Sequence, residues 1–272
     1  MEYAGGFEQT PAGTSGTSIF DPVLCELTYR WFCPPGGTVL DPFAGGSVRG
    51  IVAAMLGRQY IGIDLRPEQL AANCEQWATI GTAEQPAPQW IEGDALNLAE
   101  LTGKAQCDLI FTCPPYGDLE VYSDDPQDLS TMKWPAFLDA YRRIIAAACE
   151  QLRDDRFACF VVGDFRDGKG FYRNFPGETV AAFEAAGLRL YNEAVLVTAV
   201  GSLPIRIGKQ FESGRKLGKT HQNVLVFVKG NPRKATEACG PVEVVFLESQ
   251  PDHAEEGGAT PAPALFESLF DE

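Results

Sequence analysis

Three aspartates stand where α/β proteins usually place their chemistry. Asp41, Asp64 and Asp94 each end or directly follow a short apolar run with the composition of a β-strand. In open α/β sheets, ligands bind outside the carboxyl ends of the strands. A carboxylate there can accept from both hydroxyls of a ribose, which suits Asp64, or from an adenine amino group, which suits Asp94. The alternative is structural, because an Asp at a strand end also caps the helix that follows.

A glycine-rich turn follows the first of these aspartates. It leads into a predicted helix and reads Pro42-Phe43-Ala44-Gly45-Gly46. Glycines let the backbone approach a ligand closely. The spacing is not the G-x-G-x-x-G of dinucleotide-binding loops, so the turn only weakly indicates a phosphate cradle.

A double proline follows a further apolar run, in the sequence Thr112-Cys113-Pro114-Pro115-Tyr116. Prolines fix the backbone and leave carbonyls without competing N–H donors. Beside an extruded nucleobase, this turn would offer a carbonyl and a side-chain acceptor to the exocyclic amine, with Tyr116 as a stacking surface. Two acceptors on one amine would draw its lone pair out of conjugation and direct it at an electrophile. The alternative is a rigid turn with a core tyrosine.

Alternating strands and helices are expected to position these residues. Strands are predicted at 38–41, 60–64, 89–92, 108–112, 156–162, 188–197 and 223–229, and helices at 47–56, from Pro67, at 137–152 and at 178–186. Crossover helices between strands specify an α/β, three-layer Rossmann-like fold with a seven-stranded, mostly parallel sheet. Residues 198–222 show no helical pattern and are expected to form a long loop, so the last two strands are expected to pair antiparallel.

Composition and charge divide the chain. It has 272 residues and a net charge of −15. Residues 1–17 read as a flexible arm, 18–234 as the catalytic domain and 235–272 as an acidic tail with nine carboxylates and no Lys or Arg. No run approaches the roughly 20 apolar residues of a membrane helix, and no signal peptide is present, so a cytoplasmic protein without membrane contact is predicted. Eight cysteines without a C-x-x-C pair, and two histidines, predict buried thiols and no metal site.

Together, the motifs resemble the amino-methylating DNA methyltransferases. These motifs are, in order, Ser18–Pro22, Asp41–Gly46, Ile61–Asp64, Gly93–Ala95, Thr112–Tyr116 and His221–Gly230. The likeness covers roughly residues 18–230 and is closest to phage-type methylases, some of which serve restriction-modification. It implies S-adenosyl-L-methionine as the cofactor and DNA as the partner. The implied reaction is methyl transfer to N6 of adenine or N4 of cytosine, in a bacterium or a phage-infected host cell.

The same resemblance implies roles for individual residues. The turn Asp41–Gly46 would hold the methionine part of the cofactor, Asp64 the ribose and Asp94 the adenine. The full set of implied cofactor residues is Phe20, Asp21, Asp41, Pro42, Phe43, Ala44, Gly45, Gly46, Asp64, Leu65, Asp94 and Ala95. The catalytic corner that binds the target base would comprise Cys113, Pro114, Pro115 and Tyr116.

Two positions depart from the family's pattern. Cys113 stands where the family usually has Asp, Asn or Ser, and a thiol is a weak acceptor compared with a carboxylate or an amide. Its size is nearest to Ser, which slightly favours cytosine N4. Cys113 is not the nucleophile of the cytosine-C5 enzymes, whose cysteine follows the two prolines. The turn reads Gly45-Gly46-Ser47 where the family usually has Gly-Ser-Gly, and these small residues are still expected to admit the cofactor.

A basic segment offers phosphate contacts on an otherwise acidic chain. Residues 199–222 contain one carboxylate and the five cations Arg206, Lys209, Arg215, Lys216 and Lys219. Such a stripe can meet DNA phosphates, although it can equally be a solvated surface loop. The acidic loop 117–134 is the other candidate for contact with the base. Few side chains remain to read sequence, so a short recognition site or a weak preference is expected.

Three other functions fit parts of the sequence. The same amine chemistry would serve an RNA base N-methyltransferase. The chain could be an inactive cofactor-binding protein that retains DNA binding, with Cys113 as the lesion. The acidic tail could make it chiefly an interaction or DNA-mimic protein. Within that tail, the apolar residues of Ala264–Phe270 suggest a docking peptide for a protein partner, or a helix that folds back on the body.

Overall fold

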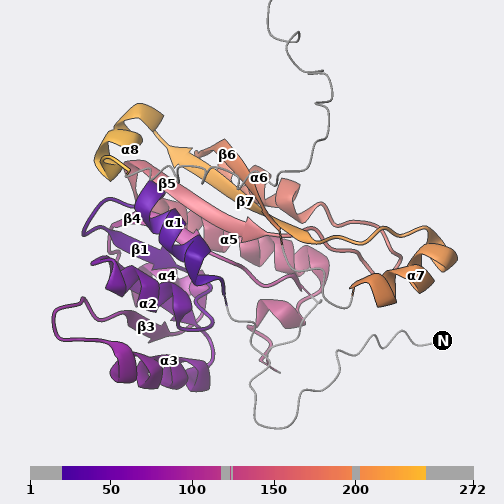
Figure 1. The fold of residues 1–272 in the computed structure, drawn as a ribbon, viewed down its shortest axis with the longest axis horizontal. Coiled ribbons are helices and arrows are strands. Elements are labelled where there is room, and N and C mark those ends of the chain that lie inside the picture. Colours follow the sequence, from indigo (N-terminus) through magenta and orange to yellow (C-terminus); the bar gives the residue numbers. More distant parts are fainter. Residues whose placement is uncertain (1–19, 118–122, 124, 198–202, 243–272) are drawn as a thin grey trace, which may run out of the picture. The chain divides into compact units, whose positions relative to one another are not determined.

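The computed structural model describes residues 20–117, 123, 125–197 and 203–242, with 203–206 described by their backbone alone (Figure 1). The predicted arm and almost all of the predicted tail, including the docking peptide, lie outside these residues. Residues up to Pro241 belong to one compact unit and Val242–Glu272 to a second.

One seven-stranded sheet forms the centre of the first unit, in the order β3-β2-β1-β4-β5-β7-β6 (Figure 1). The strands are β1 (Thr38–Asp41), β2 (Gln59–Asp64), β3 (Gln89–Glu92), β4 (Cys107–Thr112), β5 (Leu152–Val162), β6 (Arg189–Val197) and β7 (His221–Lys229). The first five strands run parallel, whereas β7 runs antiparallel to both β5 and β6. The predicted fold, including the antiparallel last pair, is confirmed.

Helices cover both faces of this sheet. They are α1 (Pro22–Phe32), α2 (Val48–Met55), α3 (Pro67–Ile80), α4 (Leu98–Leu101), α5 (Trp134–Gln151), α6 (Phe175–Ala185), α7 (Leu203–Gly214) and α8 (Pro232–Cys239), with short 3-10 turns η1 (Ala95–Asn97) and η3 (Leu129–Thr131). Helices α1, α2 and α8 pack into one core cluster, and α4, α5 and α6 pack into the other. No helix within the described ranges has both the length and the apolar character needed to cross a membrane.

The central strands are apolar on both sides because both sides are covered. Along β5, Phe157, Cys159 and Val161 face the α1 and α8 side, while the alternate residues Ala158 and Phe160 face α5 and α6. This alternation explains why the strand reads as an unbroken apolar run rather than as a half-exposed one. All eight cysteines are free thiols, and seven of them are at least partly buried.

The prediction of a loop over residues 198–222 is wrong for its middle part, because residues 203–214 form the helix α7. Pro204 is tolerated in the first turn of a helix, where its missing N–H costs nothing. Gly208 stands inside the helix and lowers its intrinsic stability by about 1 kcal/mol relative to Ala. These two residues are typical of loops and so concealed the helical pattern. In Figure 1, α7 lies beyond the ends of β6 and β7.

Helix α8 crosses the domain boundary expected after residue 234. It spans Pro232–Cys239, and its Ala235 and Cys239 are buried in the core cluster with α1 and β5. Asn231 caps it by accepting from the N–H groups of Arg233 and Lys234. The folded body therefore includes this helix, and the acidic segment that follows begins later than the sequence indicated.

Candidate active site at the carboxyl ends of the strands

A single cavity of about 830 Å³ lies at the carboxyl ends of β1 to β4. Of the implied cofactor residues, the structure brings ten to its wall, namely Phe20, Asp21, Pro42, Phe43, Gly45, Gly46, Asp64, Leu65, Asp94 and Ala95. All four residues of the base-binding corner, Cys113, Pro114, Pro115 and Tyr116, line the same cavity. Asp41 and Ala44 do not line it and lie beneath the surface. One space therefore connects the two predicted subsites.

Asp41 is the centre of a buried hydrogen-bond network under this cavity. Its side chain is fully buried. One carboxylate oxygen accepts from the N–H of Phe43 at 3.1 Å and from the hydroxyl of Thr112 at 2.5 Å. The other accepts from Nε of Arg49 at 2.6 Å and from the hydroxyl of Tyr60 at 2.7 Å. Because a carboxylate has about four acceptor positions, Asp41 has none left for a ligand.

Arg49, which the sequence analysis did not single out, carries this network to the cavity wall. Its Nη2 donates to the carbonyls of Phe43 at 2.8 Å and Ala44 at 2.7 Å. Its guanidinium lies 4.7 Å from the ring centroid of Phe20. Within the described part of the chain, Nη1 of Arg49 makes no hydrogen bond, and the residue lines the cavity. Burial opposes the charge, but the pairing with Asp41 raises the pKa of Arg49 well above its usual range.

The glycine turn exposes its backbone to the cavity. Gly45 has φ +52°, a left-handed conformation that L side chains rarely adopt. Its N–H donates to Asp64 at 2.8 Å, and its carbonyl accepts from Asn73 of α3 at 2.8 Å. A Cβ added at Gly45 or Gly46 would meet nothing within 4 Å, so side chains there would project into open space. The turn is thus both held in place and free of side chains on its ligand side.

Asp64 and Asp94 both line the cavity and both accept hydrogen bonds from backbone N–H groups. Asp64 accepts from the N–H of Gly45 and, at 2.9 Å, from the N–H of Arg66. Burial raises the pKa of Asp64, and the N–H of Arg66 opposes this shift. Asp94 accepts from the N–H of Leu96 at 2.8 Å and caps η1. The capping alternative is therefore correct for Asp94, although its side chain also borders the cavity. Asp21 likewise caps α1 while lining the cavity.

The double-proline corner is fixed by aromatic packing. The ring of Tyr116 lies 6.1 Å from that of Phe165 and 5.9 Å from that of Phe175, measured between centroids. Its hydroxyl lies 3.9 Å from Sγ of Cys113 and accepts a hydrogen bond from the side-chain amide of Gln222. Burial raises the pKa of Tyr116 well above its usual range, so the phenol stays neutral.

Gln222 is a site residue that sequence reasoning missed. It stands in β7, lines the cavity and reaches Tyr116 from 106 positions away in the chain. The segment His221–Gly230 had been matched as a family motif, but only as a core strand. The signal was the presence of a polar side chain at the start of an otherwise apolar strand.

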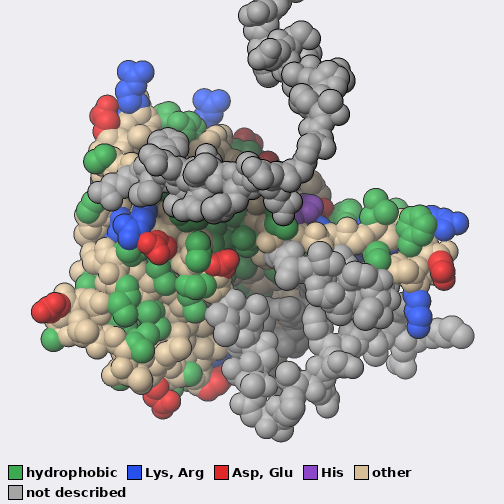
Figure 2. Space-filling view, in the orientation of Figure 1, with side chains coloured by type: hydrophobic (Ala, Val, Ile, Leu, Met, Phe, Trp, Pro, Cys, Tyr) green, Lys and Arg blue, Asp and Glu red, His purple; other side chains and the backbone are tan. Residues whose placement is uncertain are grey.

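Four of the predicted phosphate-binding cations, Lys209, Arg215, Lys216 and Lys219, lie outside the cavity wall. Lys209 and Arg215 are exposed, Lys216 and Lys219 are half-buried, and the side chain of Arg206 lies outside the described residues. In Figure 2, hydrophobic and basic side chains occur together over α7, at the right of the view. Of the acidic loop 117–134, residues 127–129 border the cavity, while 118–122 and 124 lie outside the described residues.

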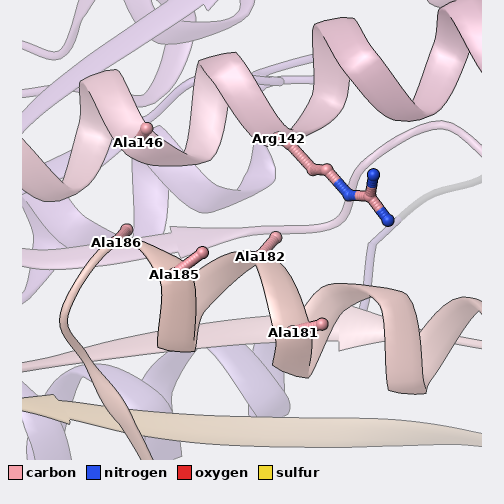
Figure 3. A pocket seen from close by; sticks show the side chains of 6 residues that line it. All are labelled: Arg142, Ala146, Ala181, Ala182, Ala185 and Ala186. Carbon is pink, nitrogen blue, oxygen red and sulfur yellow. The ribbon is translucent and has the colours of Figure 1, made fainter.

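A second cavity, of about 330 Å³, lies between α5 and α6 (Figure 3). Its wall consists of five alanines and Arg142, whose guanidinium pairs with Glu178 and points away from Ala185 and Ala186. Arg142 is the one polar side chain among its described lining residues. Across the described residues, no three His, Cys, Asp or Glu side chains cluster closely enough to hold a metal ion.

Comparisons with known proteins agree with this geometry. The sequence profile of a family described as DNA methylase matches residues 24–75, which include α1, β1, the glycine turn, α2 and β2. No curated protein sequence matches the chain. The match covers the glycine turn and Asp64 on the cofactor side of the cavity, begins after Phe20 and Asp21, and ends before Asp94 and the double-proline corner.

Solved structures share the fold at low sequence identity. TrmN from Thermus thermophilus is 20% identical with a TM-score of 0.51, over 76% of this chain and 48% of that one. NSun6 from Pyrococcus horikoshii, solved with SFG, is 15% identical with a TM-score of 0.52, over 77% and 52%. A methyltransferase from Pyrococcus furiosus is 13% identical with a TM-score of 0.51, over 82% and 88%. The chain spans about half the length of the first two.

These findings bear directly on the resemblance. The fold is shared with the solved structures of TrmN and of the Pyrococcus furiosus methyltransferase, and the profile match spans the glycine turn and Asp64. The likeness predicted from the motifs is therefore confirmed: this chain has a methyltransferase fold, and its residues 24–75 match the DNA methylase family.

Proposed function

We propose that the protein transfers a methyl group from S-adenosylmethionine to the exocyclic amine of adenine (N6) or cytosine (N4) in DNA. The observation that carries this proposal is the single cavity that joins the glycine turn and Asp64 to the corner formed by Cys113–Tyr116. Methyl transfer to an amine needs the two reactants side by side and in line, and little further chemistry from the protein.

The cofactor side of the cavity fits S-adenosylmethionine, which supplies the electrophilic methyl group when bound. In this proposal Asp64, which lines the cavity, accepts from the ribose hydroxyls, and the open backbone at Gly45 and Gly46 allows close approach. Asp41 has no free acceptor position, so its role is to hold Arg49 and the turn. Arg49 is the residue with a free donor here, and with the first N–H groups of α2 it suits the carboxylate of the methionine part.

The base side of the cavity fits a planar ring with an exocyclic amine. Tyr116 offers its face for stacking, held at its hydroxyl by Gln222. The carbonyl of Pro114 and the sulfur of Cys113 are the acceptors for the two N–H bonds of the amine. This arrangement points the nitrogen lone pair towards the cofactor side. A new N–C bond then forms as the C–S bond of the sulfonium breaks, and the amine releases one proton to solvent.

Two features support DNA as the substrate. The matching family is described as DNA methylase, and the five cations near α7 give an acidic chain a place for phosphates. The test is transfer of tritium from methyl-labelled S-adenosylmethionine into duplex DNA and, in parallel, into RNA of the same base composition. Wild-type protein should label the DNA, and Tyr116→Ala should not, although it still binds S-adenosylhomocysteine. Label found in RNA alone would refute the DNA assignment.

A further inference from the structure

Residues 165–173 form a small hairpin between β5 and α6 that does not line the cavity. Its two sides are joined by an isolated antiparallel bridge between Arg166 and Tyr172. The N–H of Asp167 donates to the carbonyl of Phe171 at 2.8 Å, and the N–H of Arg173 donates to that of Phe165 at 2.9 Å. We call residues 165–173 the aromatic hairpin.

The tip of the aromatic hairpin has a fixed conformation. A single carboxylate oxygen of Asp167 accepts from the N–H groups of Lys169 and Phe171, each at 2.9 Å. The N–H of Phe171 holds the pKa of Asp167 below its usual range. Gly170 turns the chain with φ +93°, which favours glycine. Because these contacts close the tip on itself, the backbone that carries its side chains is held in place before any partner arrives.

The hairpin presents two aromatic rings to solvent. Phe171 is 71% exposed and Tyr172 is 46% exposed. The guanidinium of Arg166 lies 3.8 Å from the ring centroid of Tyr172, and Nη1 of Arg166 donates to the carbonyl of Gly170. A large apolar ring held in water on a rigid support contributes nothing to the core. Two adjacent exposed rings form an apolar patch, and such patches occur at interaction sites.

Positive charge surrounds these rings. Arg166, Lys169 and Arg173 belong to the hairpin itself. A Cβ added at Gly170 would lie 3.0 Å from Nζ of Lys216, so this cation from the segment after α7 reaches the hairpin tip. The nearby carboxylate of Asp167 accepts from two backbone N–H groups of the tip through one of its oxygens. Aromatic rings among cations are the combination that stacks on bases and contacts phosphates.

The root of the hairpin packs against the base-binding corner. Phe165 packs against Tyr116 at 6.1 Å and against Trp134 at 5.6 Å, measured between ring centroids. The guanidinium of Arg173, at the other side of the root, lies 4.8 Å from the ring centroid of Trp134. The exposed tip is therefore held in a fixed relation to the place proposed for the extruded base.

We infer that the aromatic hairpin is a DNA-contacting element. Phe171 stacks on or wedges into the base stack of the duplex beside the extruded nucleotide, while Lys169 and Lys216 contact phosphates. The inference rests on the proposed function and deepens it, since it names the element that meets the duplex around the base. Phe171 would occupy the kind of place where apolar side chains part base steps in bent DNA.

Binding of a fluorescein-labelled DNA duplex, followed by anisotropy over a range of salt concentrations, tests this inference. Phe171→Ala should weaken binding about tenfold without changing the salt dependence, because it removes a stacking contact and no charge. Lys169→Gln should lower the slope of log Kd against log salt by about one. Phe171→Trp should restore tight binding. Trp31→Ala is the matched control, an exposed aromatic on α1, and should bind as the wild type does.

The outcomes separate the inference from the proposed function. If the wild-type protein methylates DNA and Phe171→Ala binds the duplex as tightly as the wild type does, the hairpin inference alone would be overturned. If the wild-type protein methylates no DNA but Phe171→Ala still weakens duplex binding, the proposed reaction would be overturned. The hairpin would then stand as a DNA contact. Equal binding of S-adenosylhomocysteine by both proteins shows that the variant is folded.

Discussion

The two halves of the cavity are held in place by different physics. On the cofactor half, charged and polar groups are buried and saturated, as in Asp41 with its four donors and Gly45 between Asp64 and Asn73. On the base half, aromatic rings pack around Tyr116, and a single amide from Gln222 fixes its hydroxyl. Residues of α2 and α3 form part of the wall of the cofactor half. The base half packs against the root of the aromatic hairpin, whose tip carries exposed rings and cations.

This difference suits the two ligands. A small zwitterionic cofactor needs fixed donors and acceptors that cost no reorganisation when it binds. A base that leaves a duplex needs a flat apolar seat and a rim that meets the rest of the nucleic acid. The two halves should therefore fail separately when they are mutated, and the following predictions test that separation.

The largest effect is expected from breaking the buried pair of the cofactor half. Arg49→Gln leaves the Asp41 carboxylate buried without a counter-charge, and removal of one partner of a buried ion pair costs about 3 kcal/mol or more. We expect urea denaturation to show this loss in the free energy of unfolding. The double variant Asp41→Asn with Arg49→Gln should recover at least half of it. Equal losses in the single and double variants would mean that the pair does not govern the stability of this half.

The second-largest effect is expected from removing Tyr116, the proposed stacking surface for the target base. Tyr116→Ala should lower the rate of DNA methylation about 100-fold, because the amine is no longer held in line with the methyl group. The Kd of S-adenosylhomocysteine, measured by calorimetry, should stay within about twofold of wild type because Tyr116 belongs to the other half. A variant that loses cofactor affinity and rate together would contradict the separation into halves.

The contact assigned to Arg49 predicts a smaller, ligand-specific effect. Against an Asp41→Asn background, Arg49→Gln should weaken S-adenosylhomocysteine about tenfold, the strength of a charge-assisted hydrogen bond. The same change should leave 5′-methylthioadenosine unaffected, since that ligand has no carboxylate. If Asp41→Asn alone produced the selective loss, Asp41 rather than Arg49 would hold the methionine part. An equal loss for both ligands would show that Arg49 acts only through the fold.

Removal of the hydrogen bond behind Tyr116 should cost less. Gln222→Leu leaves the ring in its aromatic cluster but frees its hydroxyl, and we expect kcat/KM for DNA to fall about fivefold, as for one neutral hydrogen bond. Tyr116→Phe removes the same bond from the other side. The two changes combined should lower kcat/KM no further than either alone. Full additivity in this cycle would mean that Gln222 acts on the base by another route.

The smallest effect concerns a charge cluster at the opposite ends of the strands. Asp108 accepts from the N–H of Thr38 and from Arg153 and Arg156. Burial alone would raise the pKa of Asp108, but these donors outweigh it and hold that pKa below its ordinary value of 3.8. Its stabilisation is thus present above about pH 4 and is lost as the pH falls through the lowered pKa. Asp108→Asn should reduce this acid dependence of unfolding and leave methylation at neutral pH unchanged.

The sequence predicted what local patterns determine. Apolar runs that end in Asp41, Asp64 and Thr112 identified the strands, and parallel pairing necessarily brings their carboxyl ends together. The order of the motifs then predicted the cavity that contains both subsites. Fold and cavity were accessible because each depends on residues adjacent in the chain and on a general rule of sheet topology.

Long-range partners were not accessible in the same way. Gln222 meets Tyr116 across 106 residues, and nothing near either position indicates the pairing. The saturation of Asp41 depends on a hydroxyl from β4 and another from β2, so its carboxylate was read as a ligand contact. Helix α7 was not predicted because Gly208 is typical of loops. The aromatic hairpin was not predicted because Gly168 and Gly170 are typical of an ordinary turn. In each case tertiary contacts outweighed the local pattern.

The most direct test of the account is the chemical identity of the methylated product. DNA incubated with the protein and S-adenosylmethionine would be digested to nucleosides and analysed by mass spectrometry against N6-methyladenosine, N4-methylcytidine and C5-methylcytidine deoxynucleoside standards. We expect a methyl group on an exocyclic nitrogen, N6 or N4, that disappears in Tyr116→Ala. A methyl group on a ring carbon, or label confined to RNA, would contradict it.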